Sequence, residues 1–363
     1  MGKKVIRHSV FYLHRWLGLG VGLLLCIAGL TGSVLVFWHE IDAWILAQRF
    51  GSVDLAGERI PIATVIETVN AAYIPDEFTL SSLTLPTLSH QPYVVWLEDA
   101  AAHHWQVLVN PYMGQVMGDR QWETSWIGRI YALHYSLLAG EVGSLIMGMV
   151  ALFAFILSLT GIILWPGWRK LIAGFKIKWR AHPKRINFDL HKVIGIIAAL
   201  FLAAIGFTGF SWNVPQARVT DAIHAVTLTP KPADLSSRSI PGQSPLPLGN
   251  LVQRAEAAMP EAAMTYVVFP SEPEDPFRVG KKQAQEKDRY GQTQVYLDQF
   301  SGEVLQINDG LNPSRADAIL NQFGPLHYGT FGGLPTRILY VFVGLSPTAL
   351  FITGLVMWRY RKT

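Results

Sequence analysis

Four histidines stand in duplicated sequence frames, each next to a long apolar run. The first frame, Leu13-His14-Arg15-Trp16-Leu17-Gly18, recurs as Leu190-His191-Lys192-Val193-Ile194-Gly195. His134 and His327 share a second frame, in which a leucine precedes and a tyrosine follows each histidine. Any one of these histidines could simply form a hydrogen bond across a helix bundle. Four in repeated frames favour a functional role, because ionisable side chains in membrane helices are costly and tend to be functional.

The chemistry that these residues favour is axial ligation of haem iron. His14 and His191 begin apolar runs, whereas His134 and His327 precede runs that return through the membrane, so each pair shares one depth. Imidazoles from two helices commonly hold haem iron, and helix bundles enclose cofactors between facing side chains. Zinc or copper would need three or four ligands at one depth. The sequence therefore predicts two b-type haems, with His14 and His191 as iron ligands of the inner haem and His134 and His327 as those of the outer haem.

Five further residues are candidates for contacts with these haems. Gly18 and Gly195 lie one turn after the inner histidines, where a missing Cβ would admit the edge of a macrocycle. Close helix packing is the alternative explanation for these small residues. Arg15 and Lys192 are expected to pair with haem propionates, unless they reflect only the excess of basic residues on the cytoplasmic side. His39, on nearly the same helix face as the first histidine but at outer depth, is a second-rank ligand or propionate contact.

A Thr-Gly pair recurs at the far end of each apolar run. The four pairs are Thr31-Gly32, Thr160-Gly161, Thr208-Gly209 and Thr353-Gly354. The glycine at this position is expected to leave space beside the haem that the other pair of histidines holds.

Membrane-spanning helices are the elements that must position these residues. Half of the residues are hydrophobic and 15% are charged, whereas about a quarter are charged in soluble domains. Four apolar runs, at about 10–38, 143–165, 193–214 and 334–358, each reach the roughly 20 residues that a membrane-spanning helix needs. The first run exceeds the apolar region of a signal peptide and is not followed by a cleavage site, which predicts an uncleaved helix.

These observations predict an α-helical membrane bundle of four transmembrane helices in two tandem repeats, with two small external α+β modules. The predicted order is helix 10–38, external module 39–133, helix 134–165, basic loop 166–190, helix 191–214, external module 215–327, helix 328–358 and tail 359–363.

Charge predicts the orientation of this bundle. Lysines and arginines gather before the first run, in the 166–190 loop and after the last run, and Asp189 is the only acid among them. The positive-inside rule then places both termini and that loop in the cytoplasm. The sole cysteine, Cys26, lies in the first run, so neither external segment contains a disulfide and cysteine-ligated clusters are excluded.

Each external segment has the pattern of a small α+β module. In the first, helical spacing over 60–73 precedes strand patterns at 82–85, 93–97 and 105–110. In the second, a helix over 248–259 precedes a strand at 264–269. A strand–turn–strand signal closes each module, as Asn110-Pro111-Tyr112-Met113-Gly114-Gln115-Val116 and as Asp298-Gln299-Phe300-Ser301-Gly302-Glu303-Val304.

A helix–strand–strand unit closed by Asn/Asp-x-aromatic-x-Gly-x-Val resembles a PepSY module. Two such modules between four helices resemble the PepSY-associated transmembrane family over nearly the whole chain. That resemblance implies a protein of the bacterial inner membrane, with its large loops in the periplasm, that carries haem and serves iron acquisition. It also implies a ferric siderophore or other ferric chelate as the periplasmic acceptor.

The function expected from these features is a ferric-chelate reductase that passes single electrons from the inner haem to the outer haem. No Gly-x-Gly-x-x-Gly motif follows a predicted strand, and the 166–190 loop is too short for a nucleotide domain, so no NAD(P)H- or flavin-binding site is expected on this chain. The sequence leaves the electron donor open between a quinol, a flavin reductase and another cytoplasmic protein. One alternative is a non-redox PepSY membrane protein that binds peptide or regulates a protease. Another is a transporter with parallel repeats, which the lack of acidic residues at mid-depth disfavours.

Overall fold

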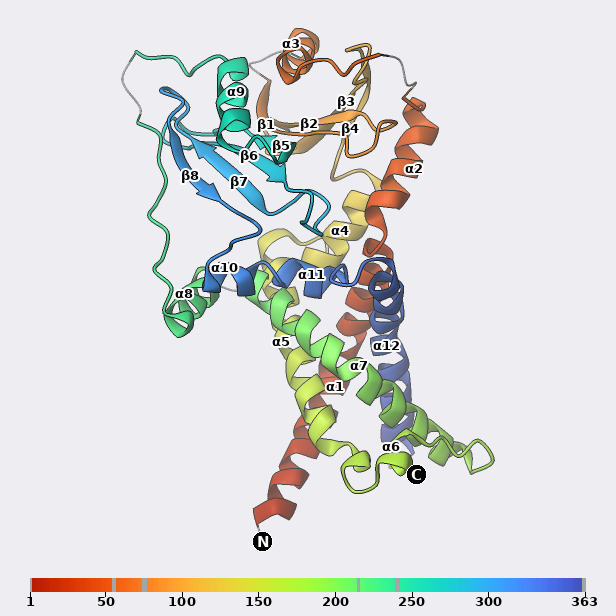
Figure 1. Ribbon diagram of the computed structural model, residues 1–363. Coiled ribbons are helices and arrows are strands. Elements are labelled where there is room, and N and C mark those ends of the chain that lie inside the picture. The colour runs from red at the N-terminus through yellow and green to blue at the C-terminus, as the bar shows by residue number, and fades with distance from the viewer. Residues whose placement is uncertain (1, 54–56, 74–76, 214–215, 239–241, 361–363) are drawn as a thin grey trace. The chain divides into compact units, whose positions relative to one another are not determined.

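The computed structural model describes residues 2–53, 57–73, 77–213, 216–238 and 242–360 (Figure 1). Two compact units are present. The helical unit consists of Met1–Trp38, Arg129–Ile223 and Gln322–Thr363, and the sheet unit consists of His39–Gly128 and His224–Asn321. The predicted boundary at residues 214–215 and the end of the predicted tail, 361–363, lie outside the described residues.

Four long helices form the helical unit and confirm the predicted spans in outline. They are α1 (Gly2–Leu35), α5 (Gly140–Leu164), α7 (Pro183–Asn213) and α12 (Leu334–Arg359). Each is long and apolar enough to cross a membrane. α1 and α7 each pack against both α5 and α12, so α1 and α7 occupy opposite corners of the bundle (Figure 1).

The packing of the bundle is typical of membrane helices, because small residues point inward and large apolar residues point outward. On α7, Ala198, Ala199 and Ala203 are buried, whereas the side chain of Leu200 is 72% exposed. Small residues let helix backbones approach closely, and lipid covers an outward leucine without an energetic cost.

The outer histidines lie on short helices that precede the long ones. His134 is on α4 (Trp126–Ser136), and His327 is on α11 (Phe323–Tyr328). The predicted helices starting at 134 and 328 are therefore wrong in detail, because the chain breaks before each membrane span. Leu137 and Leu138 both adopt positive φ, at 53° and 59°, a left-handed conformation that costs a non-glycine residue roughly 1–2 kcal/mol.

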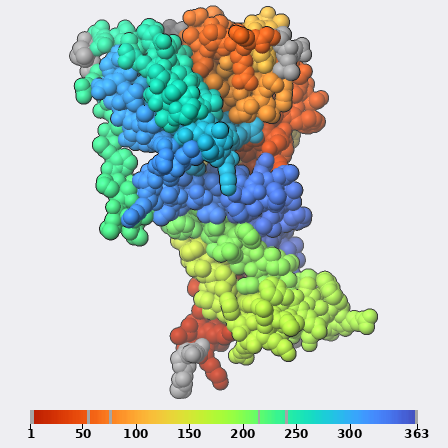
Figure 2. Space-filling view, viewed as in Figure 1, coloured from red at the N-terminus to blue at the C-terminus, as the bar shows by residue number. Residues whose placement is uncertain are grey.

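The loop between α5 and α7 contains a 3-10 helix, η1 (Pro166–Trp168), and the short helix α6 (Leu171–Phe175). α7 begins at Pro183 rather than at the predicted 191, so part of the predicted loop is helical. The loop lies at the surface of the helical unit (Figure 2), where Trp168 and Trp179 are 65% and 66% exposed. Exposed tryptophans beside basic residues are typical of a membrane interface.

The sheet unit contains one antiparallel sheet of eight strands. The strands are β1 (Phe78–Thr84), β2 (Tyr93–Asp99), β3 (His104–Val109), β4 (Val116–Gln121), β5 (Ala263–Val268), β6 (Phe277–Lys282), β7 (Thr293–Leu297) and β8 (Val304–Asn308). Their order is β4-β3-β2-β1-β5-β6-β7-β8. Because β1 pairs with β5, the two external modules predicted from the sequence share a single sheet. β6 has no counterpart among the strands predicted from the sequence.

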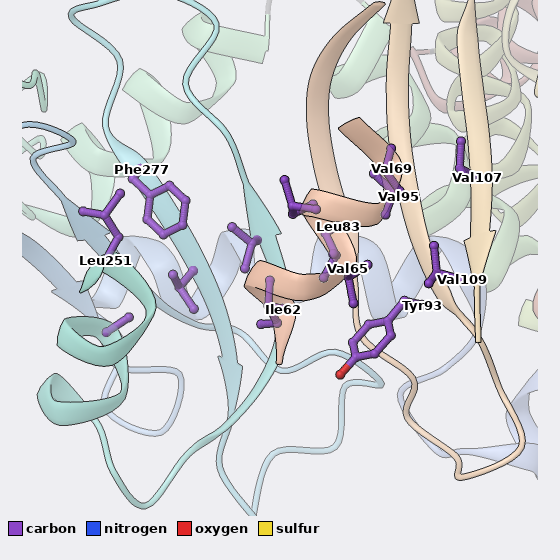
Figure 3. Packing of buried hydrophobic residues seen from close by; sticks show 14 of the residues in the cluster. Ile62, Val65, Val69, Leu83, Tyr93, Val95, Val107, Val109, Leu251 and Phe277 are labelled. Carbon is purple, nitrogen blue, oxygen red and sulfur yellow. The ribbon is translucent and has the colours of Figure 1, made fainter. Parts of the chain in front are cut away.

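Each half of the sheet is preceded by a helix that covers the hydrophobic core. These helices are α3 (Ile62–Ala72) and α9 (Leu248–Ala258). α3 places Val65 and Val69 one turn apart on its buried face, and α9 contributes Leu251 (Figure 3). Along β2, Tyr93, Val95 and Leu97 are buried while the residues between them are half-buried, as the two-residue period of a strand requires.

The other described helices of the chain are α2 (Trp38–Phe50), α8 (Gln216–Thr227) and α10 (Arg315–Leu320). A buried ion pair ties α2 to the edge strand β4. Arg120 donates through Nη1 to Oδ1 of Asp42 at 2.8 Å and through Nη2 to Oδ2, and its Nε donates to Gln106 at 2.7 Å.

Loss of one partner of this pair is expected to destabilise the sheet unit. Asp42→Ala would leave the buried guanidinium of Arg120 without its counter-charge, so we expect the free energy of unfolding to fall by about 3 kcal/mol or more. Thermal unfolding followed by tryptophan fluorescence measures the change. The double variant Asp42→Ala/Arg120→Met should recover most of the loss, and equal instability of the single and double variants would contradict this role.

Candidate functional site

The two predicted histidine pairs come together in the helical unit. The imidazole rings of His14 on α1 and His191 on α7 have centroids 6.4 Å apart and planes at 85°. The rings of His134 on α4 and His327 on α11 also have centroids 6.4 Å apart, with planes at 74°. Since α1 and α7 are opposite corners of the bundle, the first pair meets across its interior.

A threonine from another segment contacts Nδ1 of each histidine. The distances from Nδ1 to the threonine Oγ1 are 2.8 Å for His14–Thr160, 3.0 Å for His134–Thr31, 2.8 Å for His191–Thr353 and 2.8 Å for His327–Thr208. These are the threonines of the four Thr-Gly pairs. Each repeated frame therefore links the two pairs. Its histidine belongs to one pair, and the threonine at the far end of its long helix contacts a histidine of the other pair.

The hydrogen bonds of these threonines select the histidine tautomer. Each hydroxyl also lies 2.7–2.8 Å from the carbonyl four residues earlier in its own helix, to which it donates. A hydroxyl has one proton, so a threonine that donates to its own helix accepts a hydrogen bond from the ring. Nδ1 then carries the ring proton and Nε2 carries the lone pair. This is the form in which a histidine binds a metal through Nε2 while a second hydrogen bond orients the ring.

The glycine of each Thr-Gly pair makes room for the same ring. A Cβ added to Gly32 would lie 3.0 Å from Cε1 of His134, and one added to Gly209 would lie 3.2 Å from Cε1 of His327. The corresponding distances at Gly161 and Gly354 are 3.4 Å to His14 and 3.7 Å to His191. A histidine ring thus lies against the face that the sequence analysis assigned to a haem.

The centroid spacing of each pair is that of two imidazoles whose Nε2 atoms face one metal ion between them. A metal–imidazole bond is about 2.0 Å long and a ring nitrogen lies roughly 1.1 Å from its centroid, so two rings on opposite sides of one ion have centroids roughly 6.3 Å apart. Both pairs have a separation of 6.4 Å. Within the described part of the chain, no group of three or more His, Cys, Asp or Glu could hold a metal ion. The donor set fits two axial ligands rather than a closed zinc site.

The glycine stripe of the long helices divides into two kinds of position. A Cβ at Gly29 would clash with the carbonyl oxygen of Gly344, and one at Gly206 would lie 2.7 Å from that of Ala151, so these glycines serve helix packing. At Gly18 and Gly195 the nearest atoms are leucine methyls at 3.8 and 3.6 Å, which are ordinary contacts. Helix packing therefore does not require glycine at these two positions, and their contact with a cofactor stays a prediction.

The two basic candidates behave differently. Nε of Arg15 is buried and has no hydrogen-bond partner among the described residues, while its guanidinium lies over the rings of Tyr12 and Trp16. Arg15 therefore has an unused donor, and its contact with a haem propionate stays a prediction. The donors of Lys192 are used, because its buried Nζ donates to Asp189 at 2.6 Å and to the carbonyls of Ala173 and Lys176 at 2.8 and 3.0 Å. The predicted contact of Lys192 with a propionate is therefore wrong. Lys192 instead holds the loop before α7 in place.

His39 belongs to the sheet unit, where it lies near the start of α2. Its ring centroid is 5.8 Å from that of Tyr290. The outer pair is formed by His134 and His327, so His39 is not needed to complete it.

Two features of the site were not predicted from the sequence. One is the role of the threonine hydroxyls, although their fixed spacing from the histidines is a signal in the sequence. Trp212 was also missed; its ring centroid lies 4.9 Å from that of His327 and 5.7 Å from that of Tyr328, whose side chain is 55% exposed. No repeat marks Trp212.

The threonine contacts lead to a test of the inner pair. Thr160→Val keeps the shape of the side chain but removes the acceptor for Nδ1 of His14, so the affinity of this pair for the predicted haem should fall about 10- to 100-fold. The change is measured as the rate at which the purified protein loses haem to an excess of a haem-binding apoprotein, followed by absorbance. The control is Ser158→Ala, because Ser158 donates only to Ala154 of its own helix at 2.8 Å. Equal loss from both variants would contradict the role of Thr160.

Comparison with known proteins agrees with this architecture. The family model described as PepSY-associated TM region matches residues 11–361. A comparison with curated proteins found no match. Because the family model covers nearly the whole chain, the protein belongs to the PepSY-associated transmembrane family.

Proposed function

We propose that this protein is a di-haem oxidoreductase of the bacterial inner membrane that passes single electrons to a periplasmic ferric siderophore or other ferric chelate. The observation that carries the proposal is the recurrence of one arrangement at two levels. In both pairs the rings are 6.4 Å apart, and each Nδ1 is held by a threonine, which leaves Nε2 for the iron. In the proposal His14 and His191 hold the inner haem, and His134 and His327 hold the outer haem.

A b-type haem bound at each pair would supply a one-electron Fe(III)/Fe(II) couple. The protein's contribution is to fix the two positions. Along α1, His14 belongs to the inner pair and Thr31 contacts His134 of the outer pair. Thr31 lies seventeen positions after His14 in the sequence, so the two levels are about 25 Å apart along the helix. That distance covers most of the roughly 30 Å hydrocarbon core of a bilayer.

The aromatic residues beside the outer pair provide a route for the electron from the outer haem to the surface of the helical unit. Trp212 contacts the ring of His327 and also Tyr328, which reaches the surface of the helical unit. In the proposed topology both termini and the basic α5–α7 loop are cytoplasmic, and the sheet unit is periplasmic. Electrons enter at the inner pair from a quinol or a cytoplasmic protein.

The acceptor follows from coordination chemistry and from the family resemblance. A siderophore holds Fe(III) through hard oxygen ligands, and Fe(II) is a softer ion that such ligands bind less tightly. One electron converts the bound Fe(III) to Fe(II), and the chelator is released unchanged. Reduction therefore frees the iron without destroying its carrier.

Reoxidation by a ferric chelate tests this function. Dithionite-reduced protein, freed of excess dithionite, should be reoxidised anaerobically by a ferrioxamine-type chelate, and a ferrous-specific trap should capture about one iron for each electron lost. His39→Ala should behave as wild type. Reduced protein that ignores every ferric chelate offered but is reoxidised by oxygen would overturn the substrate while leaving electron transfer intact.

A further inference from the structure

The face of the sheet opposite the hydrophobic core carries a cluster of polar and aromatic side chains in its second half. Arg278 on β6 pairs with Tyr296 on β7. Tyr266 on β5 pairs with Gly280, which in turn pairs with Gln294. Residues two apart on a strand share a face, so Arg278 lies on the same face as Gly280 and diagonally across from Tyr266. Tyr266, Arg278, Gln294 and Tyr296 are called the donor patch below.

The position of the Tyr266 ring is fixed by its packing against Gly280. A Cβ at Gly280 would clash with the ring of Tyr266, so the ring lies flat across the glycine. Gln294 then fixes the two hydroxyls, because its Nε2 donates to the Tyr266 hydroxyl at 3.0 Å and its Oε1 accepts from the Tyr296 hydroxyl at 2.5 Å.

This network leaves hydrogen-bond donors unused. The Tyr266 oxygen accepts from Gln294, so its own proton is free to be donated. Over the described ranges, the guanidinium of the half-buried Arg278 forms no hydrogen bond or ion pair. Burial raises the pKa of Tyr266, and the charge of Arg278 opposes that rise, which indicates that the two groups are close. Asp288 also lies near Tyr266. Its carboxylate accepts a hydrogen bond from the backbone amide of Tyr290 at 2.9 Å.

We propose that the donor patch binds the anionic, oxygen-rich surface of a ferric chelate. A guanidinium and a phenol proton beside an aromatic ring match a ligand that presents oxygen acceptors and negative charge. The inference rests on the proposed function for the identity of the ligand and names its class, a chelate with net negative charge. The patch is a binding surface and takes no part in the transfer of the electron.

Binding of redox-inert gallium(III) complexes tests the patch separately from haem chemistry. Isothermal titration of the full-length protein should show that anionic gallium citrate binds more tightly than the neutral gallium complex of a cyclic trihydroxamate. Arg278→Gln should weaken citrate-complex binding about tenfold or more, and Tyr266→Phe about fivefold. Arg278→Lys, which keeps the charge, should retain part of the affinity. The matched control is Arg238→Gln, because Arg238 is an exposed arginine of the same unit.

Unchanged binding of gallium citrate to Arg278→Gln would overturn the inference, as would an equal loss in Arg238→Gln. A misfolded Arg278→Gln protein is recognised by its lowered unfolding temperature, and Tyr266→Phe then decides the outcome. If the protein lacks haem but binds gallium citrate through Arg278, the patch stands and the reductase proposal fails. If haem and chelate reduction are present while Arg278→Gln binds normally, the reductase stands and the patch fails.

Discussion

Alanine at His14 or at His191 should remove one and the same haem. Their rings face each other at 6.4 Å, and loss of either leaves the iron with one axial imidazole. We expect each variant to retain about half of the wild-type haem, with the same spectral and redox component missing from both. Haem content and a potentiometric titration of the purified variants measure this result.

His134→Ala and His327→Ala should remove the other component and leave the first. In these two variants the inner haem should stay reducible, while iron capture from a ferric chelate should stop, because the exit next to Trp212 is lost. His39→Ala is the control and should keep both components. Loss of the same component from His14→Ala and His134→Ala would contradict the pairing across the bundle.

Leucine at Gly18 should empty the inner site without loosening the bundle. The nearest atom to a Cβ at Gly18 is a leucine methyl 3.8 Å away, so a side chain fits there. Helical side chains point towards the preceding turn, so a leucine at this position is expected to cover the turn that carries His14. We expect inner-haem occupancy to fall about tenfold or more with the outer component unchanged. Gly195→Leu should give the same result from the other side of the pair.

Gly29→Ala provides the contrast to these variants. Its Cβ would meet the carbonyl oxygen of Gly344, so it should lower the stability of the α1–α12 contact and affect both haems. Size-exclusion chromatography and thermal unfolding separate the two outcomes. If Gly18→Leu lowers the unfolding temperature as much as Gly29→Ala and keeps both haems, Gly18 serves helix packing.

Periodicity and repetition made much of this fold predictable. Apolar runs located the four membrane helices, because a bilayer demands long uninterrupted hydrophobic segments. The repeated frames predicted which histidines would meet, since equal positions in duplicated helices reach equal depths. The helix and strand patterns of the two external segments located α3, α9 and most strands.

Other features depend on contacts between distant residues and left no local signal. The pairing of β1 with β5 joins two segments more than 180 residues apart, and it turns two expected modules into one sheet. The breaks at Leu137 and Leu138 run against residue preference, because leucine rarely adopts positive φ. The acid partner of Lys192, Asp189, lies three residues earlier on the same helix and was visible in the sequence, but nothing indicated that the carbonyls of Ala173 and Lys176 would take its other donors.

The Thr-Gly pairs were a sequence signal of which only the glycine was given a role. Their spacing from the histidines is regular, and the glycine was expected to leave space for a macrocycle. In the folded chain the threonine hydroxyl and the glycine act together on the histidine of the opposite level. The hydroxyl orients the ring and the glycine admits it, which explains why the two residues occur as a pair.

The amount of haem bound per chain tests the central claim most directly. A pyridine haemochrome assay on the purified full-length protein, divided by protein concentration from amino-acid analysis, should give a ratio near two, because each of the two histidine pairs holds one haem. A ratio near one would mean that one pair is structural and would contradict the two-haem account. A ratio near zero in protein expressed with abundant haem would contradict the proposed function altogether.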